Sequence, residues 1–137
     1  MSYRDIVREL VISHEGLRLK PYPDTVGKLT IGVGRNLDDK GISKQEAMMM
    51  LDADLADAER DAVSVVPSFV ALSANRKAVL IDMALNLGRT RLAGFKNMLA
   101  RIDSADFEGA AAQMLQSKWA RQVGVRATQL AHLMRTG

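Results

Sequence analysis

The 137-residue sequence contains no cysteine and no long apolar run, and both absences narrow its possible classes. Without cysteine the chain can form neither a disulfide framework nor a thiolate zinc site. A membrane-spanning helix needs roughly 18 apolar residues, so we expect no stable membrane insertion. His14 and His132 lack the spacing of metal ligands, and Gly32-Val-Gly34 lacks the third glycine of a dinucleotide-binding motif. We therefore expect no metal and no cofactor.

The N-terminal segment also lacks the pattern of a signal peptide. Arg8 and Glu9 interrupt the apolar residues that follow Met1, whereas a signal peptide has a basic start and then an apolar run of about 7–15 residues. We therefore expect synthesis in the cytoplasm without an export signal. A target outside the membrane would then require delivery by another component.

Length and composition are those of one globular domain. Hydrophobic residues make up 47% of the chain, which excludes a mostly disordered protein. The net charge is +3, divided into −3 over residues 1–75 and +6 over residues 76–137. A basic C-terminal half indicates a polyanionic partner, which could be nucleic acid, an anionic membrane face or the acidic peptides of a cell wall.

The first predicted element is a helix that begins after Ser2 and ends at Gly16. Ser2 and Asp5 have the spacing of a capping box, and glycine commonly follows the last residue of a helix. Apolar residues recur between them at helical spacing and predict one buried stripe. That stripe consists of Tyr3, Ile6, Val7, Leu10 and Val11.

Residues 17–41 are predicted to form a small sheet. The prolines in this stretch exclude helix, and residues 29–33 alternate between apolar and small or polar side chains, as in a strand with one apolar face. A third short strand or an irregular loop is expected near residues 35–41.

The rest of the chain is predicted to be helical. Ser43 and Glu46 have the spacing of a second capping box, which opens a long helix that Pro67 ends. The further helices expected are one from Ser73 to Gly88, one near Phe95–Ile102, one capped by Ser104 and one near Arg126–Met134.

These elements predict an α+β fold in which helix dominates. We expect a single domain spanning residues 1–137. Within it, residues 1–42 would form the N-terminal helix and sheet, residues 43–66 the connecting helix, and residues 67–137 a helical lobe.

Two carboxyl groups near the N-terminus stand in contrasting surroundings. Glu15 lies at the negative end of the first helix beside apolar residues, so its pKa should rise and suit it to be a general acid. Asp24 lies in a polar turn that would keep it ionised, and the Thr30 hydroxyl could orient a water between them. Glycoside hydrolysis requires such a pair. Spacing alone leaves a plainer alternative open, in which Glu15 is a surface acid and Asp24 an ordinary turn residue.

The run from Glu15 to Gly34 carries the strongest signal in the sequence. It reads EGLRLKPYPDTVGKLTIGVG and resembles the active-site signature of the phage lysozymes, glycoside hydrolase family 24. That signature has a Glu-Gly pair, a Tyr two residues before an Asp, and a Gly-x-x-Thr-Ile-Gly-x-Gly motif. The resemblance continues in family order over nearly the whole chain. The further matching segments are Gly41–Ala47, Leu92–Phe95, Ser117–Trp119 and Arg135–Gly137.

The resemblance implies a lysozyme-like fold and specific catalytic roles. Glu15 would protonate the glycosidic oxygen, Asp24 would activate or orient the attacking water, and Thr30 would help to hold that water. Members of this kind invert the anomeric centre, which predicts a separation of roughly 6.5–9.5 Å between the two carboxyl groups. Arg126 stands at the position of a family arginine that pairs with the region of the catalytic glutamate.

The resemblance also assigns substrate-binding positions. These are Asn36, Leu85, Asn86 and Gln113. Asn86 falls where the family often has Asn or Gln facing the cleft. The other three, with Met98, differ from the residues of the best-known member, and Arg35 replaces a common histidine, so substrate preference does not follow from the resemblance.

The implied activity is that of an endolysin. Such an enzyme hydrolyses the β-1,4 bond between N-acetylmuramic acid and N-acetylglucosamine in bacterial peptidoglycan and so lyses the host cell. We expect a monomer without a nucleic-acid partner, which reaches the periplasmic wall through a membrane lesion made by a separate protein. A tail-borne or prophage-encoded use is equally compatible.

Three alternatives are weighed against this interpretation. Residues 119–133 resemble a helix-turn-helix with Gly124 at the turn, and binding of DNA phosphates would explain the basic half. That alternative leaves the order of Glu15, Asp24 and Thr30 unexplained. A relative that binds peptidoglycan without cleaving it would not need all three, and a transglycosylase needs only the acid.

Trp119 is expected in the core rather than stacked on sugar.

Overall fold

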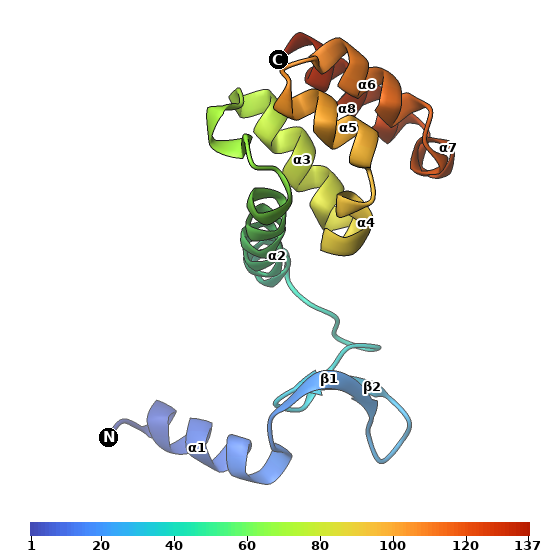
Figure 1. Ribbon diagram of the computed structural model, residues 1–137. Coiled ribbons are helices and arrows are strands. Elements are labelled where there is room, and N and C mark those ends of the chain that lie inside the picture. The colour runs from blue at the N-terminus through green and yellow to red at the C-terminus, as the bar shows by residue number, and fades with distance from the viewer. The chain divides into compact units, whose positions relative to one another are not determined.

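The structure, a computed structural model, describes all 137 residues and divides them into two compact units (Figure 1). Unit 1 comprises residues 1–49 and unit 2 comprises residues 50–137. Helix α2 (Lys44–Val65) begins in unit 1 and ends in unit 2. None of the helices combines the length and the apolar character that crossing a membrane requires.

Unit 1 begins with α1 (Tyr3–Glu15), whose two ends confirm the sequence prediction. Ser2 forms a full capping box with Asp5, and Gly16, at φ 74°, closes the helix by donating its N–H to the Ile12 carbonyl. The predicted burial of the apolar stripe is wrong for this unit, because no residue of α1 is buried. A helix stripe is buried only where an apolar surface covers it, and the sheet of unit 1 does not provide that surface.

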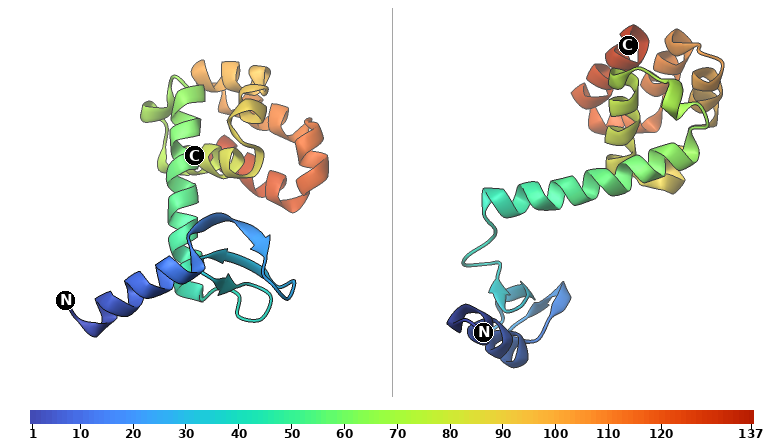
Figure 2. Two further views of the ribbon diagram at one scale, coloured as in Figure 1. Left: turned by 90° about the horizontal axis from the view of Figure 1, so that it is seen from below. Right: turned by 90° about the vertical axis from the view of Figure 1, so that its left-hand side faces the viewer.

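Three antiparallel strands follow in the spatial order β1-β2-β3 (Figure 2). They are β1 (Arg18–Pro23), β2 (Leu29–Gly32) and β3 (Arg35–Asn36). The prolines of β1 are tolerated because β1 is an edge strand. Thr30 lies on the central strand, opposite Tyr22 on one side and Asn36 on the other. The predicted small sheet with a short third strand is therefore confirmed.

The start of α2 confirms the second capping box. The Ser43 hydroxyl accepts the N–H of Glu46 at 3.1 Å, and the Glu46 carboxylate accepts the N–H of Ser43 at 2.9 Å. The helix ends at Val65, two residues before Pro67.

Unit 2 is a bundle of short helices around one core (Figure 1). After a 3-10 turn, η1 (Phe69–Ala71), these are α3 (Ala74–Leu87), α4 (Arg89–Ala93), α5 (Lys96–Asp103), α6 (Phe107–Leu115), α7 (Lys118–Val123) and α8 (Val125–Thr136). Helix α6 packs against both α5 and α8, and α8 also packs against α3. Four methionines, Met83, Met98, Met114 and Met134, are fully buried, which agrees with the use of this flexible side chain to fill a core.

The predicted cap at Ser104 is wrong. Ser104 follows the end of α5, and its hydroxyl donates to the Arg101 carbonyl instead of accepting from α6. The cap of α6 is Asp106, whose carboxylate accepts the N–H of Gly109 at 2.9 Å. Between them Ala105, at φ 59°, turns the chain. Helices α4 and α7, with five and six residues, are too short for periodicity to predict them.

Candidate active site

The three predicted catalytic residues all belong to unit 1. Glu15 is the last residue of α1, Asp24 follows β1 directly, and Thr30 lies on β2. One compact unit therefore carries all three residues.

The carboxyl group of Glu15 lies against the backbone of Gly34. A Cβ atom built on Gly34 would be 2.8 Å from Oε2 of Glu15 and 2.9 Å from its Cδ. Gly34 also has a φ of 71°, which residues with a side chain rarely adopt. The backbone conformation therefore favours glycine at this position, and a side chain there would also displace the Glu15 carboxyl.

The carboxylate of Asp24 is fixed by the turn that follows it. Its Oδ1 accepts the N–H of Val26 at 2.9 Å and the N–H of Lys28 at 2.8 Å. The Gly27 N–H donates to the Asp24 carbonyl at 3.0 Å and completes the turn. Both side-chain bonds go to Oδ1, which leaves Oδ2 to accept a hydrogen bond from water.

Thr30 is a buried polar residue, with 3% of its surface exposed. Its hydroxyl donates to the carbonyl oxygen of Lys28 at 2.8 Å. A hydroxyl oxygen that donates its one proton can still accept hydrogen bonds. Thr30 can therefore support the turn and accept from a water at the same time.

An ion pair spans the loop between β3 and α2. The two terminal nitrogens of Arg35 donate to Oε1 and Oε2 of Glu46 at 2.9 and 2.8 Å, and Nη1 also donates to the Gly41 carbonyl at 3.1 Å. The Arg35 side chain, and after it the hydrogen bonds from Ser43, lower the pKa of Glu46 to about 2. Sequence reasoning did not predict this pair, since no periodic pattern links two residues across a loop.

Asn36, predicted to bind substrate, holds the turn after β3. Its Nδ2 donates to the Asp39 carboxylate and its Oδ1 accepts the Asp39 N–H, both at 3.0 Å. These bonds give Asn36 a structural role, and its contact with substrate stays a prediction.

In unit 2, Asn86 is oriented by Trp119. The indole N–H of Trp119 donates to Oδ1 of Asn86 at 2.7 Å, which leaves the NH₂ of Asn86 free to donate elsewhere. Trp119 is 3% exposed and meets Phe95 edge to face, with ring centroids 6.1 Å apart. The expectation that Trp119 is a core residue is confirmed.

Arg126 pairs with Asp82 within unit 2. Its Nε donates to Oδ1 of Asp82 at 2.8 Å, and Nη2 lies 2.7 Å from the same oxygen. The predicted pairing of Arg126 with the region of Glu15 stays a prediction. No sequence spacing pointed to Asp82, because the partners lie on helices α3 and α8, 44 residues apart.

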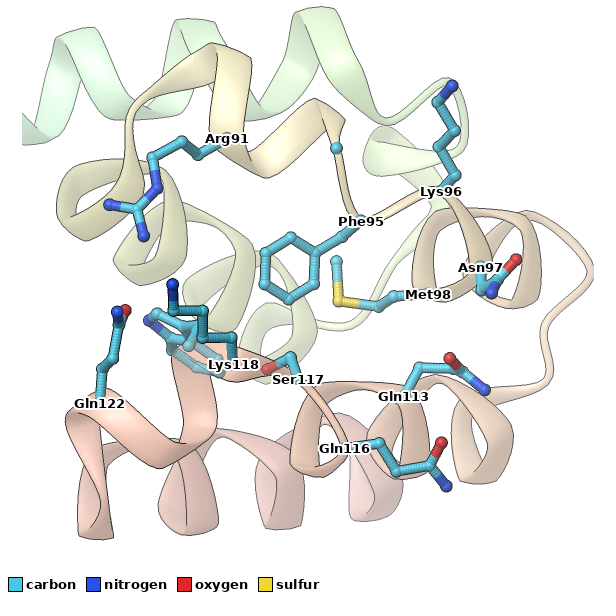
Figure 3. A pocket seen from close by; sticks show the side chains of 12 residues that line it. Arg91, Phe95, Lys96, Asn97, Met98, Gln113, Gln116, Ser117, Lys118 and Gln122 are labelled. Atoms are coloured by element: carbon cyan, nitrogen blue, oxygen red, sulfur yellow. The ribbon is translucent and has the colours of Figure 1, made fainter.

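Two pockets in unit 2 are lined by Gln113 and Leu85, two of its predicted substrate residues. The first, of about 540 Å³, includes the apolar residues Phe95, Met98 and Trp119 in its lining. Figure 3 shows Phe95 and Met98 next to each other. The lining also includes the amides and cations Arg91, Lys96, Asn97, Gln113, Gln116, Lys118 and Gln122, together with Ser117. The second pocket, of about 440 Å³, lies between α2 and α3 and is lined by Leu85 and Asp82. Gln113 and Leu85 therefore belong to different pockets.

Comparison with known proteins identifies the family. A family model described as phage lysozyme matches residues 12–135. The chain belongs to the phage lysozyme family. The match includes Glu15, Asp24, Thr30 and Gly34, and it extends across residues 119–133, the segment that resembles a helix-turn-helix.

Curated relatives of this phage lysozyme carry lysozyme and phage names. It is 32% identical to the pre-baseplate central spike protein Gp5 of Enterobacteria phage T4, over 94% of this chain but 27% of that protein. It is 25% identical to probable T4-type lysozyme 2 of Dictyostelium discoideum, over 96% of this chain and 94% of the relative. It is 29% identical to the SAR-endolysin of Escherichia phage Mu, over 90% of this chain and 71% of the relative.

The family assignment confirms the predicted class of enzyme. A phage lysozyme is a hydrolase that lyses peptidoglycan, and this chain is an enzyme of that class. The chain spans about a quarter of the phage T4 spike protein and more than two thirds of the other two relatives.

Proposed function

We propose that this phage lysozyme hydrolyses the β-1,4 bond between N-acetylmuramic acid and N-acetylglucosamine. The observation that carries the proposal is that the two oxygens of the Asp24 carboxylate have different partners. Oδ1 accepts both hydrogen bonds from the turn, and Oδ2 can accept a hydrogen bond from water. An aspartate that served only the turn would be equally well replaced by asparagine, so the proposal can be tested at this atom.

In the proposed reaction, Glu15 gives its proton to the glycosidic oxygen as that oxygen leaves the anomeric carbon. A water attacks the same carbon from the opposite face, and its proton passes to Oδ2 of Asp24. Thr30 accepts a hydrogen bond from this water and orients it. Direct attack by water inverts the anomeric centre, and it requires a carboxyl separation of roughly 6.5–9.5 Å.

We propose that unit 2 binds the substrate through both pockets. The first pocket combines an apolar surface with amides and three cations, Arg91, Lys96 and Lys118. This chemistry suits a glycan strand that carries acidic peptides, because amides bond to sugar hydroxyl groups and cations attract carboxylates. Asn86, Gln113 and Leu85 are the proposed contacts, with Asn36 in unit 1 and with Arg126 in support.

The proposed biological role is that of an endolysin. The chain would act as a monomer on the periplasmic cell wall, after release through a membrane lesion made by a separate protein. The basic C-terminal half would assist its approach to an anionic wall, an effect that salt weakens.

Digestion of purified peptidoglycan followed by identification of the new ends tests this function. Reducing N-acetylmuramic acid ends support hydrolysis, anhydro ends indicate transglycosylation, and an intact wall would contradict both. Proton NMR of the fresh product reports the anomer and so decides inversion. Glu15→Gln should abolish cutting, whereas Glu9→Gln, the same change elsewhere on α1, should not.

A further inference from the structure

The Glu15 carboxyl lies close to the backbone of Gly34, a residue without a side chain. Gly34 approaches the Glu15 carboxyl so closely that a methyl group at this position would require the carboxyl to move. The backbone of Gly34 therefore borders the space that the Glu15 carboxyl occupies. Gly34 is not itself part of a strand, since β2 ends at Gly32 and β3 begins at Arg35.

Strand pairing alone holds this segment weakly. β3 consists of two residues, which pair with Thr30 and Ile31 of β2. Beyond the strand, the N–H of Leu37 donates to the Leu29 carbonyl at 2.7 Å. These bonds attach residues 35–37 to β2 on one edge. The opposite edge of these residues needs a separate contact to hold it.

Arg35 supplies that contact directly after Gly34. Its guanidinium donates to both carboxylate oxygens of Glu46 and to the Gly41 carbonyl. The Glu46 carboxylate is itself fixed, because it accepts the Ser43 N–H at the start of α2. A planar guanidinium that makes three such bonds has little freedom, whereas a lysine ammonium could not match both oxygens and the carbonyl together.

We propose that Arg35 is a positioning residue for Glu15, acting through the backbone of Gly34 from its bidentate pair with Glu46. This inference rests on the proposed function, in which Glu15 is the general acid. Arg35 needs no contact with the substrate for this role. Its loss should therefore reduce the rate of the chemical step and leave substrate binding unchanged.

The test compares three variants, Arg35→Lys, Glu46→Gln and the double variant, with a control pair in unit 2. Arg101 and Asp106 form the control, since Nη1 lies 2.7 Å from Oδ2 and Asp106 also accepts a backbone N–H at a helix start. Arg101→Lys therefore makes the same chemical change in a similar local arrangement. Steady-state kinetics on soluble glycan strands from peptidoglycan are measured where circular dichroism shows every variant folded.

We expect Arg35→Lys and Glu46→Gln each to lower kcat roughly tenfold with KM unchanged, within the ~100-fold that a misplacement of about 1 Å can cost. The double variant should be no slower than the slower single variant, because both changes break one pair. Arg101→Lys should keep the original kcat. An unchanged kcat in Arg35→Lys, a rise in KM alone, or an equal loss in Arg101→Lys would overturn the positioning role.

The Glu15→Gln variant separates this inference from the function on which it rests. Loss of cutting in Glu15→Gln together with an unchanged kcat in Arg35→Lys overturns the positioning role alone. Cutting retained by Glu15→Gln overturns the proposed function itself.

Discussion

The backbone N–H of Asp24 and the side-chain hydroxyl of Thr30 donate to one acceptor, the carbonyl oxygen of Lys28, at 2.9 and 2.8 Å. The two residues proposed to handle the attacking water are thereby tied to one atom of the β1–β2 turn. A carbonyl has two lone pairs, so both bonds can form together. Any change in this turn should therefore affect both residues at once.

Replacement of Asp24 separates its role in the turn from its proposed role in catalysis. Asp24→Asn keeps an oxygen that can accept the N–H groups of Val26 and Lys28, so its stability should stay close to that of the original chain. Its activity should fall by about 10²–10⁴-fold, the usual contribution of a general base. Asp24→Ala should lose the activity and also about 1–2 kcal/mol of stability, because two hydrogen bonds disappear. Urea unfolding and wall-lysis assays measure the two effects, and an active Asp24→Asn would favour the plain turn residue.

Thr30 offers a second pair of contrasting variants. Thr30→Val keeps the shape of the buried side chain but removes its hydroxyl, so it should cost about 1 kcal/mol of stability and reduce the rate of cutting. Thr30→Ser keeps the hydroxyl and should retain most of the activity. Chemical denaturation and initial rates on purified peptidoglycan provide the comparison. Equal rates for the two variants would exclude a role for this hydroxyl in holding water.

Gly34→Ala should harm the enzyme by two mechanisms that a matched control can separate. Alanine at a φ of 71° is strained, and its methyl group would also collide with the Glu15 carboxyl. Gly88, in unit 2, has a φ of 82° with nothing within 4 Å of its Cβ position. Gly88→Ala should therefore show only the strain, about 1 kcal/mol.

Both variants should be less stable in thermal unfolding, and Gly34→Ala alone should lose kcat when each is measured in its folded state. If the two variants kept the same kcat, the contact between Gly34 and Glu15 would have no catalytic consequence.

The stability of the chain should depend on pH through Glu46. Arg35, followed by Ser43, lowers the pKa of this carboxyl from 4.5 to about 2. A group whose pKa is lower in the folded state stabilises the fold above its unfolded pKa, and this stabilisation disappears as the pH falls through the folded pKa. The contribution should therefore be complete above 4.5 and lost on approach to about 2.

The measurement is the free energy of unfolding against pH for the original chain and for Glu46→Gln. The difference between the two curves should shrink over that interval, and added salt should reduce it because the pair is partly exposed. A difference that did not vary with pH would show that Glu46 acts only as a neutral helix cap.

Several parts of the fold were predictable because they depend on neighbouring residues. The capping boxes at Ser2 and Ser43 and the helix stops at Gly16 and Gly88 each rest on bonds within a single turn of the chain. The start of α6 was less predictable, because Ser104 and Asp106 compete to cap it. Ala105, which lies between them, has a φ of 59°, and its residue type does not predict this conformation.

The candidate active site likewise has features that the sequence predicted and features that it did not. The ordered run of motifs from Glu15 to Gly34 was sufficient to indicate the family and the three candidate catalytic residues, since a family signature is a property of residue order. Contacts between distant positions were not visible in that order. The pairs Arg35–Glu46, Arg126–Asp82 and Trp119–Asn86 join residues 11 to 44 positions apart, and only folding brings them together.

For this chain, sequence by itself determined which residue types carry the proposed chemistry and which local elements present them. Tertiary structure alone decided that the Glu15 carboxyl lies against Gly34 and that Arg35 anchors the adjacent backbone to α2. The physical reason is the distance along the chain between the interacting residues. Caps, turns and strand alternation depend on residues a few positions apart. The position of a carboxyl group depends on packing and ion pairs between segments, which exist only once the chain has closed on itself.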